Sequence, residues 1–450
     1  MSRAIDVGAL LDQGPWTAQQ KRWTILAALA IIFDGFDIQI LGFAIPSLIR
    51  EWHVARSAFG PVLALGLAGM AVGSPLAGYI GDRFGRRTAL IGCVSLFGLA
   101  TIATSFVNGV AGLAVLRVLT GMGAGGALPN AAALSAEFAP LRRRHAAVLL
   151  TIVCVPLGGM VGGVIASQVL PVLGWRALYM IGGALPLAFA IVLWLALPES
   201  PRFLARRPEA RQRLTGLLRQ LGHDVDDGTI YEDRTKVVAD SRAPIRTLFS
   251  PALARDTVGL WIAYFFCLAS IYVMFGWLPT LLTSQGISLA TATTGLAVYN
   301  LGGVCGVVLW TFLITTFGSR GPMLAGALGT AVSAILVLLI PFHASTPVFL
   351  LAAIGLDGLL ANAVQTSMFA LATHVYPTAV RSSGVAYASA IGRTGGVISS
   401  LFGAVLIQAG PVVFWWAMGA AMIAVFAGLA WVRNHVGTAD QREPAAVASS

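Results

Sequence analysis

Two aspartates, Asp34 and Asp37, lie near the middle of an apolar segment, 24–49, that is long enough to cross a bilayer as a helix. Their three-residue spacing puts both carboxylates on one helix face. Each ionised carboxylate at that depth costs roughly 2.5–3.5 kcal/mol, so the pair must face water, meet a cation or take up protons. The pair is therefore our first candidate for proton chemistry. The alternative is a buried structural pair that is bonded to neighbouring helices.

A single arginine, Arg393, occupies the middle of another apolar segment, 380–408. A buried guanidinium needs a partner, and its planar fork matches a carboxylate through two contacts. We expect Arg393 to bind a substrate carboxylate, and an internal acid when the site is empty; a permanent ion pair between helices is the alternative. Rings and amides are expected to frame the remaining cavity: Phe33, Phe36, Phe43, Asn130, Trp277, Tyr299, Asn300, Asn362 and Gln365. The alternative for each ring taken alone is helix packing, because aromatic residues are common in membrane cores. One cation, apolar walls and a few amides suit a small aromatic monocarboxylate.

The elements that must position these side chains are membrane helices. Of the 450 residues, 57% are hydrophobic and 11% are charged, whereas soluble domains carry about 25% charged residues. The chain contains twelve apolar segments of spanning length: 24–49, 58–80, 88–107, 110–136, 146–169, 177–197, 256–283, 291–316, 323–342, 346–373, 380–408 and 411–432. We predict an all-α membrane protein with six-helix bundles at 1–198 and 256–434, a linker at 199–255 and a tail at 435–450.

The basic residues lie in short gaps between apolar segments, so the formal net charge of +10 does not indicate nucleic-acid binding. Arg and Lys gather on one side, which predicts that both termini and the linker are cytoplasmic. The first 20 residues show no cleavable signal peptide, and the four cysteines lack disulfide or metal-ligand spacing. We expect a monomer in a bacterial inner membrane, without a cofactor, whose partners are protons, a small carboxylate and the lipid bilayer.

The two halves of the chain resemble each other. Pro140 and Arg144, which precede the fifth apolar segment, recur 237 residues later as Pro377 and Arg381 before the eleventh. Two repeated halves with a site between them near mid-membrane are typical of an alternating-access transporter.

A motif rich in glycine and arginine follows the second apolar segment. It contains Gly78, Asp82, Arg83, Gly85, Arg86 and Arg87. Glycines permit close backbone approach, and Asp82 can accept from an arginine. The motif resembles the loop 2–3 signature of the major facilitator superfamily, and the resemblance covers essentially the whole chain. It implies a cytoplasmic charge lock that holds the outward-facing state, with Glu137, Arg381 and Arg117 as further members. Arg117 is expected to couple to nearby acids, and the alternative is a snorkelling arginine.

Further stretches resemble the aromatic acid/proton symporters within this superfamily. They are Asp34-Gly35-Phe36-Asp37 with Gly42-Phe43 and Pro46, the stretch 117–130, the motif 198–204, and Tyr376-Pro377 with Arg381, Gly384 and 392–395. This resemblance implies import of a hydroxybenzoate-type acid together with protons. Protons would neutralise Asp34 or Asp37, the carboxylate would bind Arg393, and the loaded protein could then close toward the inside.

Two features depart from the family pattern. The loop 318–322 has lost the acid, which predicts a lopsided charge lock. Asp357 is an additional membrane acid that can pair with Arg393, carry a proton, alter substrate choice or face a polar cavity without a dedicated role.

Other activities stay open at this point. The charges also fit a dicarboxylate or a sugar acid, and 156–163 is loosely similar to the glycine motif of efflux antiporters. We expect neither an enzyme nor a sensor. The chain has no Walker-type, His-Glu-x-x-His or Gly-x-Ser-x-Gly motif and no sizeable signalling domain.

Overall fold

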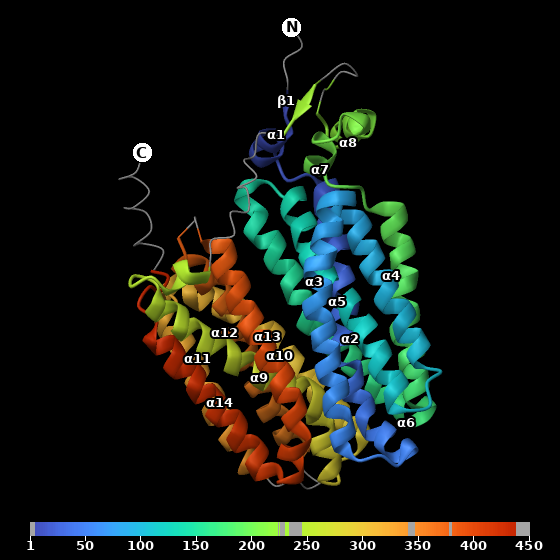
Figure 1. The fold of residues 1–450 in the computed structure, drawn as a ribbon, viewed down its shortest axis with the longest axis vertical. Helices are drawn as coiled ribbons and strands as arrows, with labels where there is room; N and C mark the ends of the chain where they lie inside the picture. The colour runs from blue at the N-terminus through green and yellow to red at the C-terminus, as the bar shows by residue number, and fades with distance from the viewer. Residues whose placement is uncertain are drawn as a thin grey trace.

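The computed structural model describes residues 5–223, 225, 230–233, 245–340, 347–377 and 380–437, so parts of the predicted linker and most of the predicted tail lie outside the described residues. Two helical bundles lie side by side (Figure 1). The N-terminal bundle contains α2 (Ala18–Trp52), α3 (Phe59–Phe84), α4 (Arg86–Thr104), α5 (Val110–Phe138) and α6 (Arg144–Ala196). The C-terminal bundle contains α9 (Ala254–Ser284), α10 (Leu289–Phe317), α11 (Arg320–Leu338), α12 (Pro347–Val375), α13 (Arg381–Gln408) and α14 (Pro411–Trp431). Short 3-10 turns are η1 (Arg56–Ala58), η2 (Leu141–Arg143), η3 (Pro208–Ala210) and η4 (Ile245–Phe249).

Helix α2, which carries both aspartates, begins six residues before the predicted segment. A capping box starts it: the Gln20 amide donates to Thr17 Oγ1 at 3.3 Å, and the Thr17 amide donates to Gln20 Oε1 at 2.8 Å. The apolar segment underestimates the length of the helix, because apolarity marks only the part inside the bilayer. The capping box at Thr17 lies among polar residues.

Helix α6 reverses direction at Gly174, whose φ of 75° and ψ of 179° are not helical. Added Cβ atoms at Gly162 and Gly182 would both touch the ring of Phe36, although twenty residues of straight helix would separate them by about 30 Å. The α6 segment therefore crosses the membrane twice. By length and composition, eleven described helical segments can span a bilayer. With α6 counted as two spans, the predicted twelve crossings are confirmed.

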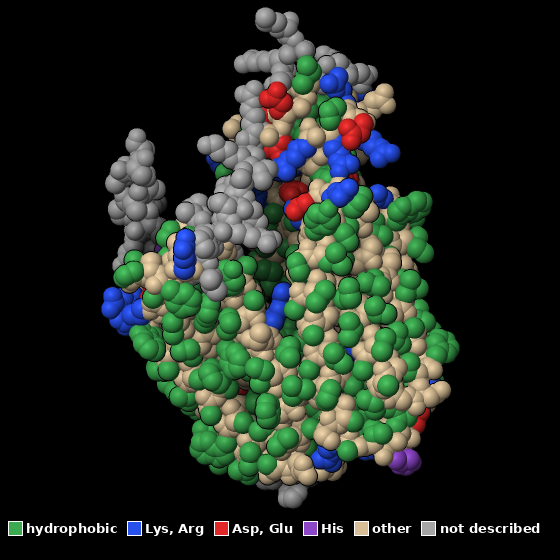
Figure 2. Space-filling model, in the orientation of Figure 1, with side chains coloured by type: hydrophobic (Ala, Val, Ile, Leu, Met, Phe, Trp, Pro, Cys, Tyr) green, Lys and Arg blue, Asp and Glu red, His purple; other side chains and the backbone are tan. Residues whose placement is uncertain are grey.

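The two bundles meet at one end of the molecule. We call the end that carries α1, α7 and α8 the linker end, and the opposite end, where α2 ends and α3 begins, the far end. The bundles touch through α2 with α9, α3 with α13 and α6 with α10. Close contacts such as Gly42 with Phe275 and Gly163 with Ala297 lie toward the far end. Figure 2 shows a hollow between the halves that opens toward the linker end, with a basic side chain visible inside it.

A small cap covers the linker end of the N-terminal bundle (Figure 1). It consists of β1 (Ile5–Asp6), α1 (Val7–Gln13), α7 (Pro201–Ala205), α8 (Arg211–Gln220) and β2 (Tyr231–Glu232), with β1 parallel to β2. Val7 and Leu11 share one buried apolar cluster with Leu214 and Leu218. Asp12 forms ion pairs with Arg144 and, at 2.6 Å, with Arg202. The cap is therefore fixed to the N-terminal bundle by both packing and charge.

Candidate functional site

Asp37 on α2 and Arg117 on α5 form an ion pair inside the N-terminal bundle. Arg117 Nη1 lies 3.6 Å from Asp37 Oδ2 and donates to the Asp37 carbonyl oxygen at 3.2 Å. Thr101 on α4 donates to Asp37 Oδ1 at 2.6 Å. Asp37 is 2% exposed and Arg117 is 5% exposed. Each charge therefore depends on the other, because an unpaired charge at such a depth costs about 3–5 kcal/mol.

This geometry corrects the assignment of Arg117 to the charge lock. Arg117 lies twenty residues before Glu137 on α5, which corresponds to about 30 Å along the helix. Its guanidinium points inward to Asp37, so the snorkelling alternative is also wrong. The expected coupling of Arg117 to a nearby acid agrees with the observed contact, and the structure identifies the acid as Asp37.

Asp34 and Arg393 form no ion pair with any described residue. Asp34 is buried, and its Oδ1 atom has no hydrogen-bond partner among the described residues. Arg393 on α13 is half-buried, and no described acid lies within ion-pair distance. Both charges act on the hydroxyl of Tyr272 on α9. Groups from α2 and α13 thus both act on a hydroxyl of α9, and no described acid pairs with the Arg393 guanidinium.

The predicted aromatic walls serve helix packing. Phe36 is 3% exposed and fills the space between the two arms of α6, next to Gly162 and Gly182. Phe33 packs against Phe189 with ring centroids 5.3 Å apart. Because α6 folds back at Gly174 and covers this side of α2, the structure assigns Phe36 to the bundle core rather than to substrate contact, whereas Phe33 is partly buried against that core.

The predicted cavity amides also bond to helices. Asn130 is fully buried and donates to the carbonyl oxygens of Gly126 and Ala77, at 2.9 Å and 3.3 Å, which places it between α5 and α3. This position corrects its assignment to the substrate cavity. Asn300 donates to Gln39 Oε1 at 2.8 Å and accepts from Gln39 Nε2 at 3.1 Å. This reciprocal pair joins α10 to α2 and therefore joins the two halves.

Asp357 lies in the core of the C-terminal bundle. It is 3% exposed and accepts a hydrogen bond from Ser333 on α11 at 2.7 Å. Tyr299 on α10 lies within its electrostatic reach and packs edge-on against Phe275. No ion pair joins Asp357 to Arg393 among the described residues, so that alternative is wrong. Tyr299 and Asp357 belong to a polar cluster inside one bundle.

The predicted charge lock is partly assembled at the linker end. Asp82 pairs with Arg86 at 2.5 Å, and Arg86 lies 4.0 Å from Glu137. Arg381 instead donates to the Tyr376 carbonyl oxygen of its own bundle at 3.2 Å. The motif therefore links α3, α4 and α5 of the N-terminal bundle, and Arg381 lies apart from it, as expected where the halves are separated.

Glu199, which follows α6, caps the start of α4. The Arg87 amide donates to Glu199 Oε1 at 3.1 Å, and a helix N-terminus favours such an anion. Gly85 precedes α4 with φ of 108°, and an added Cβ there would lie 2.1 Å from Glu199 Oε2. Burial raises the pKa of Glu199, and hydrogen bonds from backbone amides of residues 87, 88 and 200 oppose this rise.

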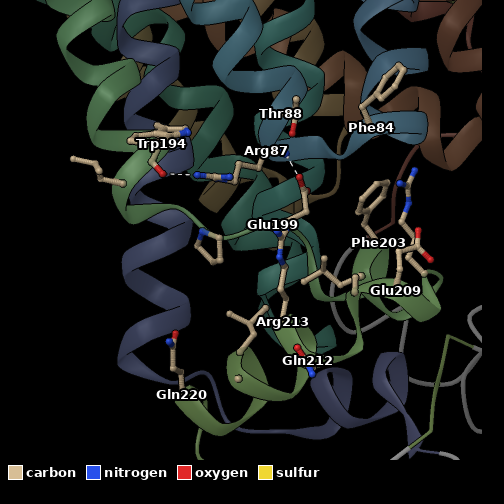
Figure 3. Close-up of a pocket in the computed structure, with 17 residues that line it drawn as sticks. Phe84, Arg87, Thr88, Trp194, Glu199, Phe203, Glu209, Gln212, Arg213 and Gln220 are labelled. Carbon is tan, nitrogen blue, oxygen red and sulfur yellow. Dashed lines mark hydrogen bonds between the residues drawn. The ribbon is translucent and has the colours of Figure 1, made fainter.

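A cavity of about 950 Å³ surrounds Glu199 and the start of α4. Figure 3 shows Glu199 between Arg87 and Arg213, with Arg87 directed toward the Trp194 carbonyl oxygen. The lining residues come from α3, α4, the end of α6 and the cap. The cavity is therefore separate from the hollow between the halves.

Four residues with defined contacts had no predicted role: Gln39, Thr101, Glu199 and Tyr272. Gln39 had a signal, because an amide two residues after Asp37 is unusual in an apolar segment. Glu199 belongs to the motif 198–204. Its role as a hydrogen-bond acceptor depends on the fold, which places it beside Arg87, 112 residues earlier in the chain. Thr101 and Tyr272 carried no signal, because single hydroxyl residues are common in membrane helices.

Comparisons with known proteins agree with this architecture. The Major Facilitator Superfamily profile matches residues 27–295 and 260–448. The chain is 35% identical to the gallate transporter of Pseudomonas putida, with 90% of each chain covered. It is 34% identical to the 4-hydroxybenzoate transporter PcaK of the same organism, with 91% of each covered. The partially occluded inward open structure of the xylose transporter XylE from E. coli superposes with a TM-score of 0.72 at 20% identity, covering 93% of this chain and 99% of that one. The chain belongs to the major facilitator superfamily of membrane transporters.

Proposed function

We propose that the protein imports a small aromatic carboxylate of the hydroxybenzoate type together with protons, by alternating access. The observation that carries the proposal is Arg393, a half-buried guanidinium in mid-membrane that no described acid neutralises. The names of the relatives support the substrate class, since they are gallate and 4-hydroxybenzoate transporters. A planar fork favours a carboxylate as the group that fills this position.

The two aspartates have different surroundings, and we propose different roles for them. Asp37 is paired with Arg117, so its protonation would release that arginine and change the contact between α2 and α5. Asp34 has an unpartnered Oδ1 and acts electrostatically on Tyr272, as Arg393 does, so we propose that its protonation bears on a carboxylate bound at Arg393. Neutralising these acids removes the cost of enclosing them, which allows closure only in the loaded, protonated state.

We propose that the linker end is cytoplasmic and that the membrane is a bacterial inner membrane. Arg and Lys are concentrated in the loops and the cap at this end. The hollow then faces the cytoplasm, which corresponds to an inward-facing state. In the outward-facing state, Arg381 of the C-terminal bundle would approach the Asp82–Arg86–Glu137 cluster and complete the lock. We expect a monomer to be sufficient.

Uptake by proteoliposomes tests the proposal. The panel consists of benzoate, 4-hydroxybenzoate, protocatechuate, gentisate and a phenylpropionate, each with and without an inward proton gradient. Gradient-dependent accumulation of at least one acid is expected. Failure of all five with folded protein would contradict the proposal and favour a dicarboxylate or a sugar acid. Proton-driven export would favour the antiporter alternative.

A further inference from the structure

A small cavity between the halves touches the Asp37–Arg117 pair. Its volume is about 30 Å³, and one water molecule requires roughly 10–15 Å³ on a comparable measure. Asp37, Gly66 and Arg117 line it from the N-terminal bundle, and Tyr272 and Ser400 line it from the C-terminal bundle. The space is therefore large enough for one water, and both halves contribute polar residues to its lining.

Arg117 supplies an independent sign of a missing partner. Its Nε atom is fully buried and has no hydrogen-bond acceptor among the described residues, although the other two guanidinium nitrogens donate to Asp37. A buried donor without an acceptor costs about 1–3 kcal/mol, and more for a charged group. An added Cβ at Gly66, which lines the cavity, would lie 3.7 Å from this Nε atom. The unpartnered donor therefore lies at the cavity wall.

We propose that this cavity binds one water molecule that joins the Asp37–Arg117 pair to Tyr272, and that Tyr272 thereby belongs to the proton path. The water accepts from Arg117 Nε and donates toward Asp37. This inference rests on the proposed proton coupling. It adds a bound water and a C-terminal-bundle hydroxyl to the two aspartates.

The transfer conserves protons at each step. The protonated Asp37 carboxyl gives its proton to the water as the water gives one to the Tyr272 hydroxyl oxygen, so the water is unchanged. In the same step the Tyr272 hydroxyl releases its own proton to water in the hollow, so the tyrosine stays neutral; Asp34 and Arg393 lie within its electrostatic reach. Two other titratable groups act on the pair: Asp34, which acts on Asp37 and does not line the cavity, and Tyr179 on α6, which is fully buried. Tyr179 does not line the cavity, whereas Tyr272 does.

Two substitutions distinguish a role in the proton path from a role in substrate binding. Tyr272→Phe removes the hydroxyl and keeps the ring against Gly396 and Phe275. Gly66→Ala fills the cavity with a methyl group that meets its neighbours only at ordinary contact distance, 3.7 Å or more. Tyr387→Phe, on the exposed side of α13, and Gly92→Ala, where an added Cβ meets no atom within 4 Å, are the matched controls.

Each variant is compared with wild type in proteoliposomes by substrate counterflow and by accumulation under a proton gradient. We expect at least a tenfold loss of gradient-driven accumulation in Y272F and G66A, with counterflow within threefold of wild type, and no change in the controls. Wild-type accumulation in both variants would overturn the proposal. An equal loss of counterflow would also overturn it, because the residues would then serve binding or packing.

A second measurement does not depend on the substrate. A structure of the purified protein that resolves ordered waters should show one water beside Arg117 Nε, and this water should be absent in G66A. An empty wild-type cavity would overturn the proposal even if transport is proton-coupled. If wild type transports none of the panel acids, the proposed function fails, and this structure still decides whether the cavity holds water.

Discussion

Gln39 on α2 and Asn300 on α10 exchange two hydrogen bonds, and this pair joins the halves toward the far end. Gly159 on α6 makes room for it, since an added Cβ would lie 2.1 Å from Gln39 Nε2 and 2.6 Å from Asn300 Oδ1. The pair can form only while the two bundles are in contact at this end. It therefore stabilises the state that is closed at the far end and open at the linker end.

Replacing Gln39 or Asn300 with alanine should weaken this closed end. A neutral hydrogen bond contributes about 0.5–1.5 kcal/mol, so losing two shifts the conformational equilibrium by about 1–3 kcal/mol, roughly 5- to 150-fold. Labelling of a cysteine placed at the far end should become faster. Thr294→Ala on α10 is the control, because Thr294 bonds only to its own helix. Unchanged labelling in both amide variants would contradict this role.

Removing one partner of the Asp37–Arg117 pair should destabilise the protein. Arg117→Ala leaves a buried carboxylate beside Thr101, with an expected loss of about 3–5 kcal/mol in unfolding free energy. The double variant Asp37→Asn with Arg117→Gln should recover most of that stability and should still fail to couple transport to protons. Thermal unfolding in detergent measures the first effect. Additive losses in the double variant would show that the two side chains are independent.

Arg393 should determine affinity for the carboxylate. Arg393→Gln should weaken binding by about 10- to 150-fold, because a hydrogen bond to a charged group contributes about 1.5–3 kcal/mol. Arg393→Lys should restore only part of the affinity, since an ammonium is a point charge without the planar fork. Direct binding to purified protein measures both, with Arg50→Gln on exposed Arg50 as the control. Wild-type affinity in R393Q would place the carboxylate elsewhere.

Glu199 should make stability depend on pH. Its pKa in the folded protein is raised by burial above the unfolded value. The folded state therefore takes up a proton more readily than the unfolded state, and stability rises as the pH falls through the folded pKa toward 4.5, the ordinary pKa of a glutamate. Glu199→Gln should remove this component, and Glu209→Gln, at an exposed position, should retain it. Unfolding temperatures measured from pH 8 to pH 5 provide the test, and identical profiles for E199Q and wild type would contradict it.

The sequence was sufficient for the fold because spanning helices follow from apolarity and length alone. It also predicted Asp34, Asp37 and Arg393 as site residues, because a charged residue in an apolar segment is visible without a structure. The partners of those charges were not predictable. Arg117 and Thr101 reach Asp37 across 80 and 64 residues, and only helix packing determines which polar groups meet.

The rings and amides were harder to assign for a related reason. Phe36 and Asn130 are common residue types in membrane helices, and apolarity does not distinguish a cavity wall from a bundle core. The fold-back at Gly174 encloses Phe36, and the close contact of α3 with α5 encloses Asn130. Both outcomes depend on tertiary contacts that residue spacing does not encode.

The ion pairs of Asp12 have a consequence for how the molecule can be observed in action. They tie the first helix to Arg144 and Arg202, and Arg206 holds Asp233 just after β2 at 2.7 Å. The described residues between Ile5 and Asp233 therefore move with one bundle as a single body whenever the bundles rock. A fluorophore on α1 is thus a fixed reference on that body. Its distance to a second probe near Arg381 would report each turnover directly.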